Sequence, residues 1–449
     1  MYKIVLALRY LIKRKITFFA ILAVTLCVFI VVVVMTVMTG LVRNFKQANH
    51  DFAGDCIVGT KSLVGFTDYE EFIQILESSG LIEGASPVVN SYGLLSPKNR
   101  DLNRGIEIMG IDPVRHSRAT GFADSLHFHT DDPADAFIPP HDPNRSGCIF
   151  GIDLLFDRNE KSEYPYETAP IRFGVAISCF PLTSRGALAK AGLGLVNTQT
   201  FYYSDHSHSG LARVDGSLIY LPLEAAQVLC GMSGSTKRAT AIHMRFRPGI
   251  KVEQGCRKVA ALWQQFKRDK KDDRYAYLLD TVTVQSWKEN RRTFIAAMEK
   301  EQTMMTVMFG FVGITTVFIV LVVFYMIISH KSKDIGILRS IGVPNFGIIQ
   351  LFEGFACIVG LVGSALGVLG GWLFLVNINR IEDLLFEKFG FQLWDRTIYA
   401  IGEIPNQVDP AVLATIAGLA VAACLAGALI PSWQIVRRSP VDILQVNQL

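Results

Sequence analysis

The chain has 449 residues, of which 50% are hydrophobic and 19% are charged. This balance argues against an ordinary soluble enzyme. The length would allow about three domains of roughly 150 residues each, but the apolar residues are concentrated in four long runs. The formal net charge of +4 says little about function, because it averages over segments of opposite charge. We expect no nucleic-acid partner.

The first segment, residues 1–15, is expected to be an amphipathic helix on the cytoplasmic face of the membrane. Ile4 and Leu8 fall on its apolar side and Lys3 on its polar side. Residues 16–42 follow as an uncharged run longer than the ~20 residues that cross the hydrocarbon layer. This run is too long for the apolar core of a signal peptide. We therefore expect it to stay attached as the first transmembrane helix.

Residues 43–301 are expected to form a large extracytoplasmic α+β domain. Its strand candidates are short and bounded by turn residues, at 55–59, 105–110, 217–221 and 241–246. Apolar residues at helical spacing predict helices at 69–78, 223–231 and 253–269. The polar, proline-rich stretch 130–144 is typical of a loop. We expect residues 120–210 to form a second lobe of this domain.

Three further transmembrane helices are predicted, which makes the chain a four-helix membrane protein. They occupy residues 302–329, 345–379 and 410–436, separated by a cytoplasmic segment at 330–344 and a short extracytoplasmic loop at 380–409, and followed by a tail at 437–449. Lys and Arg in the short segments that flank transmembrane helices are retained in the cytoplasm. Basic residues dominate 1–15 and 330–344, whereas acidic residues dominate 380–409. Both termini are therefore expected in the cytoplasm.

Two histidine pairs and eight cysteines are candidates for a metal site or a disulfide. His127 with His129, and His206 with His208, could surround zinc only if the fold brought the two pairs together. Polar loops are the simpler interpretation, so we expect no metal site. Five of the cysteines lie outside the predicted transmembrane helices, an odd number that leaves at least one without a partner in the chain. We expect mostly buried free thiols, with room for one disulfide.

The sequence contains no phosphate-binding loop of the G-x-x-x-x-G-K-[ST] type and no common hydrolase motif. We therefore expect no catalytic residues, no cofactor-binding residues and no ATP hydrolysis in this chain. ATP and magnesium would be bound by a partner.

The segment 330–344 contains a short helix pattern suited to binding another protein. An apolar ridge of isoleucines and a leucine lies between an acidic residue near the start and an arginine near the end. The simpler alternative is the frayed end of the second transmembrane helix. The residues concerned are Asp334, Ile335, Gly336, Ile337, Leu338, Arg339, Ile341 and Gly342.

Small residues recur every four positions in the last two transmembrane helices, a spacing that lets helix backbones approach closely in lipid. Generic packing within one chain is the simpler explanation of either set. The residues are Gly363, Gly367 and Gly371 in the third helix and Gly418, Ala422 and Ala426 in the fourth.

The segment 333–342, Lys-Asp-Ile-Gly-Ile-Leu-Arg-Ser-Ile-Gly, resembles the coupling-helix motif of FtsX-like, MacB-type ABC transporter permeases. Other segments are similar to the lipoprotein-releasing LolC and LolE branch. They include Gly-Ile-Asp-Pro at 110–113, Ile-Tyr-Leu-Pro-Leu-Glu at 219–224, Trp-Lys-Glu-Asn at 287–290 and Pro-Ser-Trp at 431–433. The resemblance covers nearly the whole chain and preserves the order of the motifs.

The resemblance implies a type VII ABC permease with a MacB-like periplasmic core domain in the bacterial cell inner membrane. It implies an ABC ATPase subunit in two copies, a second permease chain, identical or related, and a periplasmic carrier or lipoprotein as partners. ATP-driven movement of the periplasmic domains, or mechanotransmission, would release lipoprotein from the membrane. The alternative is an FtsX-like regulator that transports nothing and activates an extracytoplasmic cell-wall hydrolase.

Overall fold

The computed structural model describes residues 15–97, 103–156, 172–189, 194–234, 236–330, 337, 341–390 and 404–437. The chain divides into two compact units, and Asn44–Ala296 form the continuous part of unit 2. Unit 1 contains the long apolar helices. The amphipathic helix predicted for 1–15 and the tail at 437–449 fall outside the described residues, apart from Lys15 and Arg437.

Among its described residues, unit 1 is dominated by four long helices that are long and apolar enough to cross a membrane. They are α2 (Lys15–Ala53), α12 (Arg292–His330), α14 (Asn345–Val376) and α17 (Pro410–Arg437), and a shorter amphipathic helix, α15 (Ile378–Phe389), follows α14. This finding confirms the prediction of four membrane-length helices. Helices α2 and α12 are each 39 residues long, well beyond the ~20 residues that a span requires.

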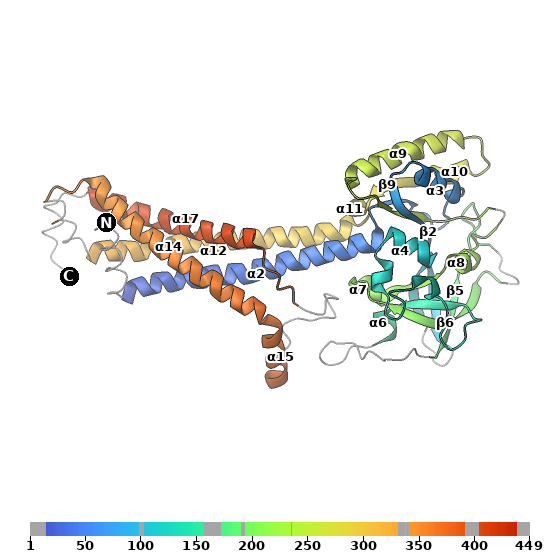
Figure 1. Cartoon of the computed structure of the whole chain (residues 1–449), viewed down its shortest axis with the longest axis horizontal. Coiled ribbons are helices and arrows are strands. Elements are labelled where there is room, and N and C mark those ends of the chain that lie inside the picture. Colours follow the sequence, from blue (N-terminus) through green and yellow to red (C-terminus); the bar gives the residue numbers. More distant parts are fainter. Residues whose placement is uncertain are drawn as a thin grey trace. The chain divides into compact units, whose positions relative to one another are not determined.

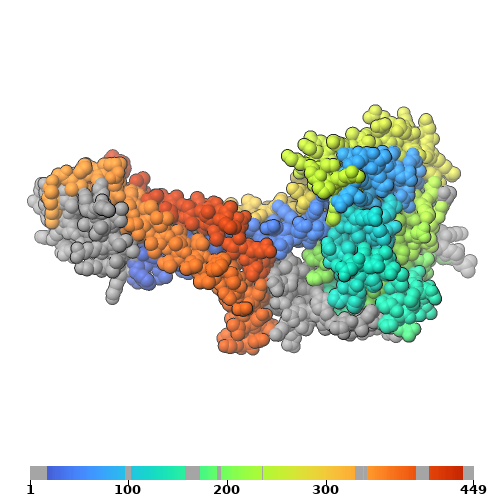
Figure 2. Space-filling view, in the orientation of Figure 1, coloured from blue at the N-terminus to red at the C-terminus, as the bar shows by residue number. Residues whose placement is uncertain are grey.

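The helices of unit 1 contact one another through small and apolar side chains. Figure 2 shows α14, in orange, packed along α17, in red. Phe324 of α12 meets Phe355 of α14 with ring centroids 5.5 Å apart. The hydroxyl of Thr316 on α12 donates to the sulfur of Cys27 on α2 at 2.9 Å. Most of the remaining apolar surface of these helices is not covered by any other part of the chain, as expected for helices that face lipid.

Unit 2 is an α+β domain inserted between α2 and α12, as predicted. Its strands are β1 (Cys56–Thr60), β2 (Ile82–Pro97), β3 (Arg104–Ile111), β4 (Gly147–Gly151), β5 (Gly174–Cys179), β6 (Asn197–Ser207), β7 (Leu218–Pro222), β8 (Ala241–Phe246) and β9 (Val282–Ser286). Its helices are α3 (Tyr69–Ser78), α4 (Pro113–Ala119), α5 (Phe122–Ser125), η1 (Pro133–Asp135), α6 (Ile152–Leu155), α7 (Ala212–Ser217), α8 (Leu223–Leu229), α9 (Val252–Asp269), α10 (Ala276–Leu279) and α11 (Trp287–Asn290).

All of these strands belong to one sheet with the order β3-β7-β4-β6-β5-β2-β8-β1-β9. The long strand β2 makes this possible, because its first part pairs with β8 and its second part pairs with both β3 and β5. The additional β2–β3 pairing closes β2, β3, β7, β4, β6 and β5 into a ring. Strands β8, β1 and β9 extend the sheet on the other side of β2.

Each of these two parts of the sheet has its own hydrophobic core, and a third cluster among the described residues lies beside the end of α2. Trp263 of α9 and Phe72 of α3 lie against β1 and β8, with ring centroids 4.7 Å apart. Phe150 and Phe201 lie within the closed part, together with α8. In Figure 1, α3 and α9 lie beside β9 at one end of unit 2, whereas α6, α7 and β6 lie at the other.

The predicted elements of unit 2 are confirmed, with small shifts of their ends. The strands at 55–59, 105–110, 217–221 and 241–246 correspond to β1, β3, β7 and β8, and the helices at 69–78, 223–231 and 253–269 correspond to α3, α8 and α9. The prediction omitted β2, β4, β5, β6 and β9. The stretch 130–144 is a loop with one short turn, η1. Within 120–210, strands β4, β5 and β6 join the common sheet instead of forming a sheet of their own.

Candidate mechanical coupling site

The predicted ATPase-coupling segment is described at three of its eight residues. Ile337 and Ile341 are exposed, and the Ile341 amide donates to the Ile337 carbonyl at 3.1 Å, as in a helical turn. Gly342 follows with a φ of +96°, a conformation that favours glycine where a helix ends. The other five residues, Asp334, Ile335, Gly336, Leu338 and Arg339, lie outside the part of the chain that the structure describes.

The glycine set in α14 lies directly against α2. A Cβ atom added to Gly363 would lie 2.8 Å from Val24 Cγ1, and one added to Gly367 would lie 2.7 Å from Val28 Cβ. Gly371 approaches Val32 in the same way, at 2.9 Å. Each of these distances is shorter than a normal carbon–carbon contact. The absence of side chains therefore lets the two backbones approach closely.

The small-residue set in α17 lies on a different face of its helix from the one that contacts the rest of the chain. Gly418, Ala422 and Ala426 are exposed, and a Cβ atom added to Gly418 would meet nothing within 4 Å. The contact with α12 is made instead by Gly427, where an added Cβ would lie 2.8 Å from the Val317 carbonyl oxygen. Spacing alone could not distinguish the two faces, because small residues occupy both.

The end of α2 is fastened inside unit 2 by a histidine–aspartate pair. His50 Nε2 lies 2.8 Å from Asp55 Oδ1, and Asp55 Oδ2 accepts from the Phe246 amide at 2.7 Å. The His50 ring also meets the Trp287 ring edge-on, with centroids 5.2 Å apart. Gly54, which lies between His50 and Asp55 in the chain, follows the last residue of α2 and has a φ of +72°. These contacts hold the last turn of α2 to the ends of β1 and β8 and to α11.

The start of α12 is fixed to the same place. Ser286 and Glu289 form a capping box at α11, in which each side chain accepts from the other residue's amide. The guanidinium of Arg291, directly before α12, stacks on the Phe52 ring of α2 at 4.4 Å from its centroid. The ends of both long helices are thus joined to each other and to the sheet. We define this cluster of His50, Phe52, Asp55, Trp287 and Arg291 as the helix-end junction.

A small cavity of about 170 Å³ lies beside the helix-end junction within unit 2. The end of α2 forms one wall, and α5 and Tyr220 contribute to the others. His116 reaches the cavity and hydrogen-bonds the Ser86 hydroxyl at 3.2 Å, and its ring lies 5.7 Å from that of His243. Burial lowers the pKa of both histidines, and that of His243 falls to about 3. Both are therefore neutral at physiological pH and act as packed core residues.

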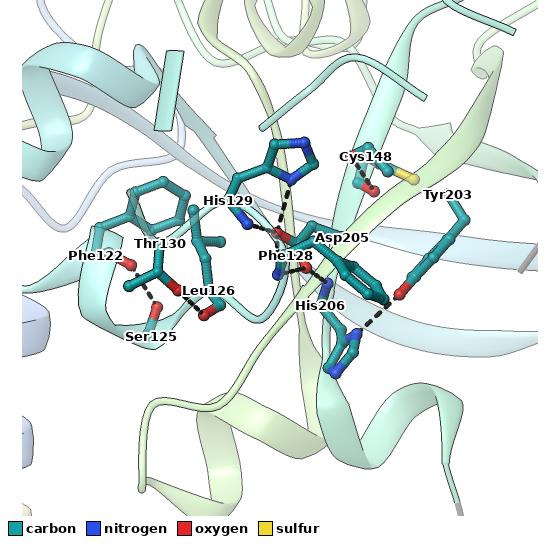
Figure 3. A network of polar contacts seen from close by, with 11 residues as sticks. Phe122, Ser125, Leu126, Phe128, His129, Thr130, Cys148, Tyr203, Asp205 and His206 are labelled. Atoms are coloured by element: carbon teal, nitrogen blue, oxygen red, sulfur yellow. Dashed lines mark hydrogen bonds and ion pairs between the residues drawn. The ribbon is translucent and has the colours of Figure 1, made fainter. Parts of the chain in front are cut away.

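The fold brings the two histidine pairs together, although no pattern in the sequence predicts this contact. His127 and His206 stack with ring centroids 4.6 Å apart, and His129 Nδ1 lies 3.0 Å from Asp205 Oδ2. The Asp205 carboxylate is fully buried and accepts from the Phe128 and His129 amides (Figure 3). Its oxygens are therefore committed to holding the loop. Among the described residues no group of three or more His, Cys, Asp or Glu side chains could hold a metal ion.

The helix-end junction was missed by sequence reasoning, although one local signal was present. Ser286 and Glu289 have the S-x-x-E spacing of a capping box, which marks the start of a helix directly before the second apolar run. The partners of Arg291 and His50 could not be read in the same way. Phe52 lies more than 200 residues before Arg291, and His50 more than 200 residues before Trp287, and the fold brings each pair together.

The chain is similar to known proteins in part and along its whole length. Residues 306–440 match the family described as FtsX-like permease C-terminal. Along its length the chain is 23% identical over 447 residues to the lipoprotein-releasing system transmembrane protein LolC of Neisseria meningitidis serogroup B, covering 98% of each protein. It is 20% identical over 451 residues to LolC of Xylella fastidiosa strain Temecula1, again covering 98% of each.

Two solved structures align with the chain at lower similarity. The periplasmic region of MacB from Actinobacillus actinomycetemcomitans aligns over 56% of this chain and 97% of its own, with 11% identity and a TM-score of 0.32. The extracellular domain of the ABC-type transporter YknZ from Gram-positive bacteria aligns over 52% and 98%, with 11% identity and a TM-score of 0.29. Residues 306–440 are therefore an FtsX-like permease C-terminal region, in a multi-pass membrane protein that is similar at low identity to the LolC proteins along its whole length.

Proposed function

We propose that this permease couples ATP hydrolysis by a separate ATPase to movement of its unit 2 on the periplasmic side of the bacterial inner membrane, and that this movement releases lipoproteins. The observation that carries the proposal is the similarity to LolC proteins over 98% of both chains. The name of those proteins places them in a lipoprotein-releasing system. In the proposed orientation both termini are cytoplasmic.

The helix-end junction supports a mechanical role. Helices α2 and α12 both continue from a membrane-length apolar part into unit 2, where His50–Asp55 and Arg291–Phe52 fasten their ends. A change in the membrane part would then reach the sheet of unit 2 through two helices at once. A loop connection would absorb such a movement through its own backbone rotations.

An ABC-type permease works with an ATPase, and we place its docking at 330–344. The exposed Ile337 and Ile341 support this assignment, because exposed isoleucines next to a membrane-length helix suit an apolar groove on a partner. The ATPase, which is present in two copies, binds the ATP and the magnesium. A second permease chain and a periplasmic carrier complete the proposed assembly.

The proposal is tested by measuring ATPase association and lipoprotein release for Leu338→Asp. An aspartate in an apolar docking contact would leave a buried charge without a partner and should cost about 2–5 kcal/mol of association. We expect the ATPase to be lost on co-purification and ATP-dependent transfer of a lipoprotein from proteoliposomes to a soluble carrier to stop. Arg339→Glu should act in the same direction by reversing the charge near the helix end.

Leu338→Met, which keeps the apolar contact, is the matched control and should retain both activities. Normal ATPase binding by Leu338→Asp would contradict the docking assignment. A wild-type assembly that binds the ATPase, releases no lipoprotein and stimulates a cell-wall hydrolase would instead support the regulator alternative.

A further inference from the structure

Two cysteines of unit 2 lie in direct contact although 51 positions separate them in the sequence. Cys179 ends β5 and Cys230 directly follows α8, and their sulfur atoms are 3.7 Å apart. Both side chains are buried in the core of the closed part of the sheet, at 1% and 2% exposure. Cys148 belongs to the same core, but its thiol donates to the Tyr202 carbonyl at 3.4 Å.

The backbone around the two cysteines is held in register by several hydrogen bonds. The Leu182 amide donates to the Cys230 carbonyl at 3.2 Å. The buried guanidinium of Arg238 donates to the Leu182 carbonyl at 2.8 Å and to the Gly231 carbonyl at 2.7 Å. One side chain thus ties together the two segments that follow the cysteines. The contact between the sulfur atoms is therefore built into the fold.

The chemistry of the pair favours oxidation. The sulfur atoms of Cys179 and Cys230 are within hydrogen-bonding distance, and this contact lowers the pKa of Cys179 against the opposing effect of burial. Ser91 Oγ lies 3.5 Å from the Cys179 sulfur and adds to the effect. The contact therefore favours the thiolate form of Cys179, which is the form that attacks a disulfide, as the two segments come together during folding.

We propose that Cys179 and Cys230 form a disulfide that joins the end of β5 to the end of α8 in the mature protein. The proposal rests on the extracytoplasmic placement of unit 2, because only an oxidising compartment maintains such a bond. The oxidant is a disulfide-carrying thiol oxidase of that compartment. Since both sulfurs are buried in the folded domain, the reaction takes place while unit 2 folds.

The reaction balances as a thiol–disulfide exchange. The Cys179 thiolate attacks one sulfur of the oxidant's disulfide, forming a mixed disulfide and releasing the first oxidant thiolate. The Cys230 thiol gives up its proton to solvent and attacks the Cys179 sulfur, which releases the second oxidant thiolate. The two cysteines lose two electrons and two protons in all, and the oxidant's disulfide is reduced to two thiols.

The bond is tested by counting oxidised cysteines in the full-length protein. Cells are quenched in acid, free thiols are blocked with N-ethylmaleimide under denaturing conditions, and disulfides are then reduced and labelled with a maleimide of large mass. We expect Cys179→Ala and Cys230→Ala each to carry two labels fewer than the wild type. Cys148→Ala, a buried cysteine of the same core, should leave the number of labels unchanged.

Thermal unfolding of the purified protein gives a second measurement. Reduction should lower the Tm of the wild type by several degrees, to that of Cys179→Ala, because the crosslink restricts the unfolded chain. The reductant should leave the Tm of Cys179→Ala unchanged. A wild-type Tm insensitive to a reductant that exposes both thiols would overturn the proposal.

Failure of the disulfide and failure of the orientation are distinguishable with an Asn144→Cys variant, whose new thiol lies in the exposed 130–144 loop. Equal label numbers in wild type and Cys179→Ala, with Asn144→Cys reactive from outside the cell, would overturn the disulfide alone. Equal numbers with Asn144→Cys protected would overturn the proposed placement of unit 2 and, with it, the compartment that the disulfide requires.

Discussion

Asp205 holds a loop in place with a carboxylate that has no exposed surface. It accepts from the amides of Phe128, His129 and His206 and from the His129 ring (Figure 3). A carboxylate in this position is stable because several donors replace the water that it loses on burial. Because these hydrogen bonds occupy the carboxylate oxygens, Asp205 supports the structure of the loop. The histidines beside it therefore have a structural role.

Asp205→Asn should destabilise unit 2 by about 2–4 kcal/mol, because the amide nitrogen would face backbone donors and leave them unsatisfied. The measurement is the Tm of the full-length protein in detergent, with Asp142→Asn on the surface as the control. Chelation by EDTA should leave the wild-type Tm unchanged. A fall in Tm on chelation that zinc restores would contradict the assignment of Asp205 to loop support.

His243 is expected to make unit 2 sensitive to acid. Burial lowers its pKa from the ordinary 6.5 to about 3, so the unfolded chain binds a proton more readily than the folded one. Its contribution to stability is complete above pH 6.5 and is lost as the pH falls toward 3. Between pH 6.5 and 4.5 the loss should reach about 2 kcal/mol.

The test is the Tm of wild type and His243→Gln across this pH range. The variant starts from a lower Tm but should lose less of it on acidification. Parallel curves for the two proteins would show that His243 does not control the acid response.

At the scale of elements, the contact between α14 and α2 depends on the missing side chain of Gly367. A Cβ there would lie 2.7 Å from Val28 Cβ and 2.8 Å from the Thr25 carbonyl oxygen. Gly367→Ala should therefore separate the helices and destabilise unit 1 by about 1–3 kcal/mol. Gly418→Ala, where the added atom meets nothing within 4 Å, is the matched control. The Tm in detergent should fall for the first variant alone, and equal losses would contradict this packing role.

Disrupting the helix-end junction should impair lipoprotein release while leaving ATP hydrolysis nearly unchanged. Phe52→Ala removes the ring beneath Arg291 and part of the packing at the end of α2. In the reconstituted assembly we expect ATP hydrolysis to remain within about twofold of wild type and release to fall by tenfold or more, which corresponds to about 1.4 kcal/mol of lost coupling.

Phe294→Ala is the control for this effect, because the Phe294 ring lies farther from the same guanidinium, at 6.0 Å, and is partly exposed. Release should stay near the wild-type level in this variant. Unimpaired release by Phe52→Ala would remove the helix-end junction from the transmission route.

At the scale of the whole molecule, the charge distribution predicts which side of the membrane each segment occupies. A cysteine introduced at Asn144 should react with an impermeant maleimide added to intact spheroplasts. A cysteine at Ser332 should react only after permeabilisation. The reverse pattern would invert the orientation. The native cysteines of unit 2 are buried or half-buried, so the wild type provides the background.

The sequence by itself determined the four membrane-length helices and the place of the large domain between the first two. A span must satisfy its backbone internally and present an apolar surface over ~20 residues, and this requirement is local in the chain. Short elements with regular apolar spacing, such as α3 and α9, were predictable for the same reason. Strands β2, β5 and β6 were not, because their pattern depends on which neighbour covers each face.

Only the tertiary structure decided which distant residues meet. Small residues occupy two faces of α17, and packing selected Gly427 instead of Gly418 for contact with α12. The sheet brought Cys179 to Cys230, His129 to Asp205 and Phe52 to Arg291. No local pattern encodes these pairs, because they depend on the order in which the strands join the sheet. That order is set by the summed burial of side chains that lie far apart in the sequence.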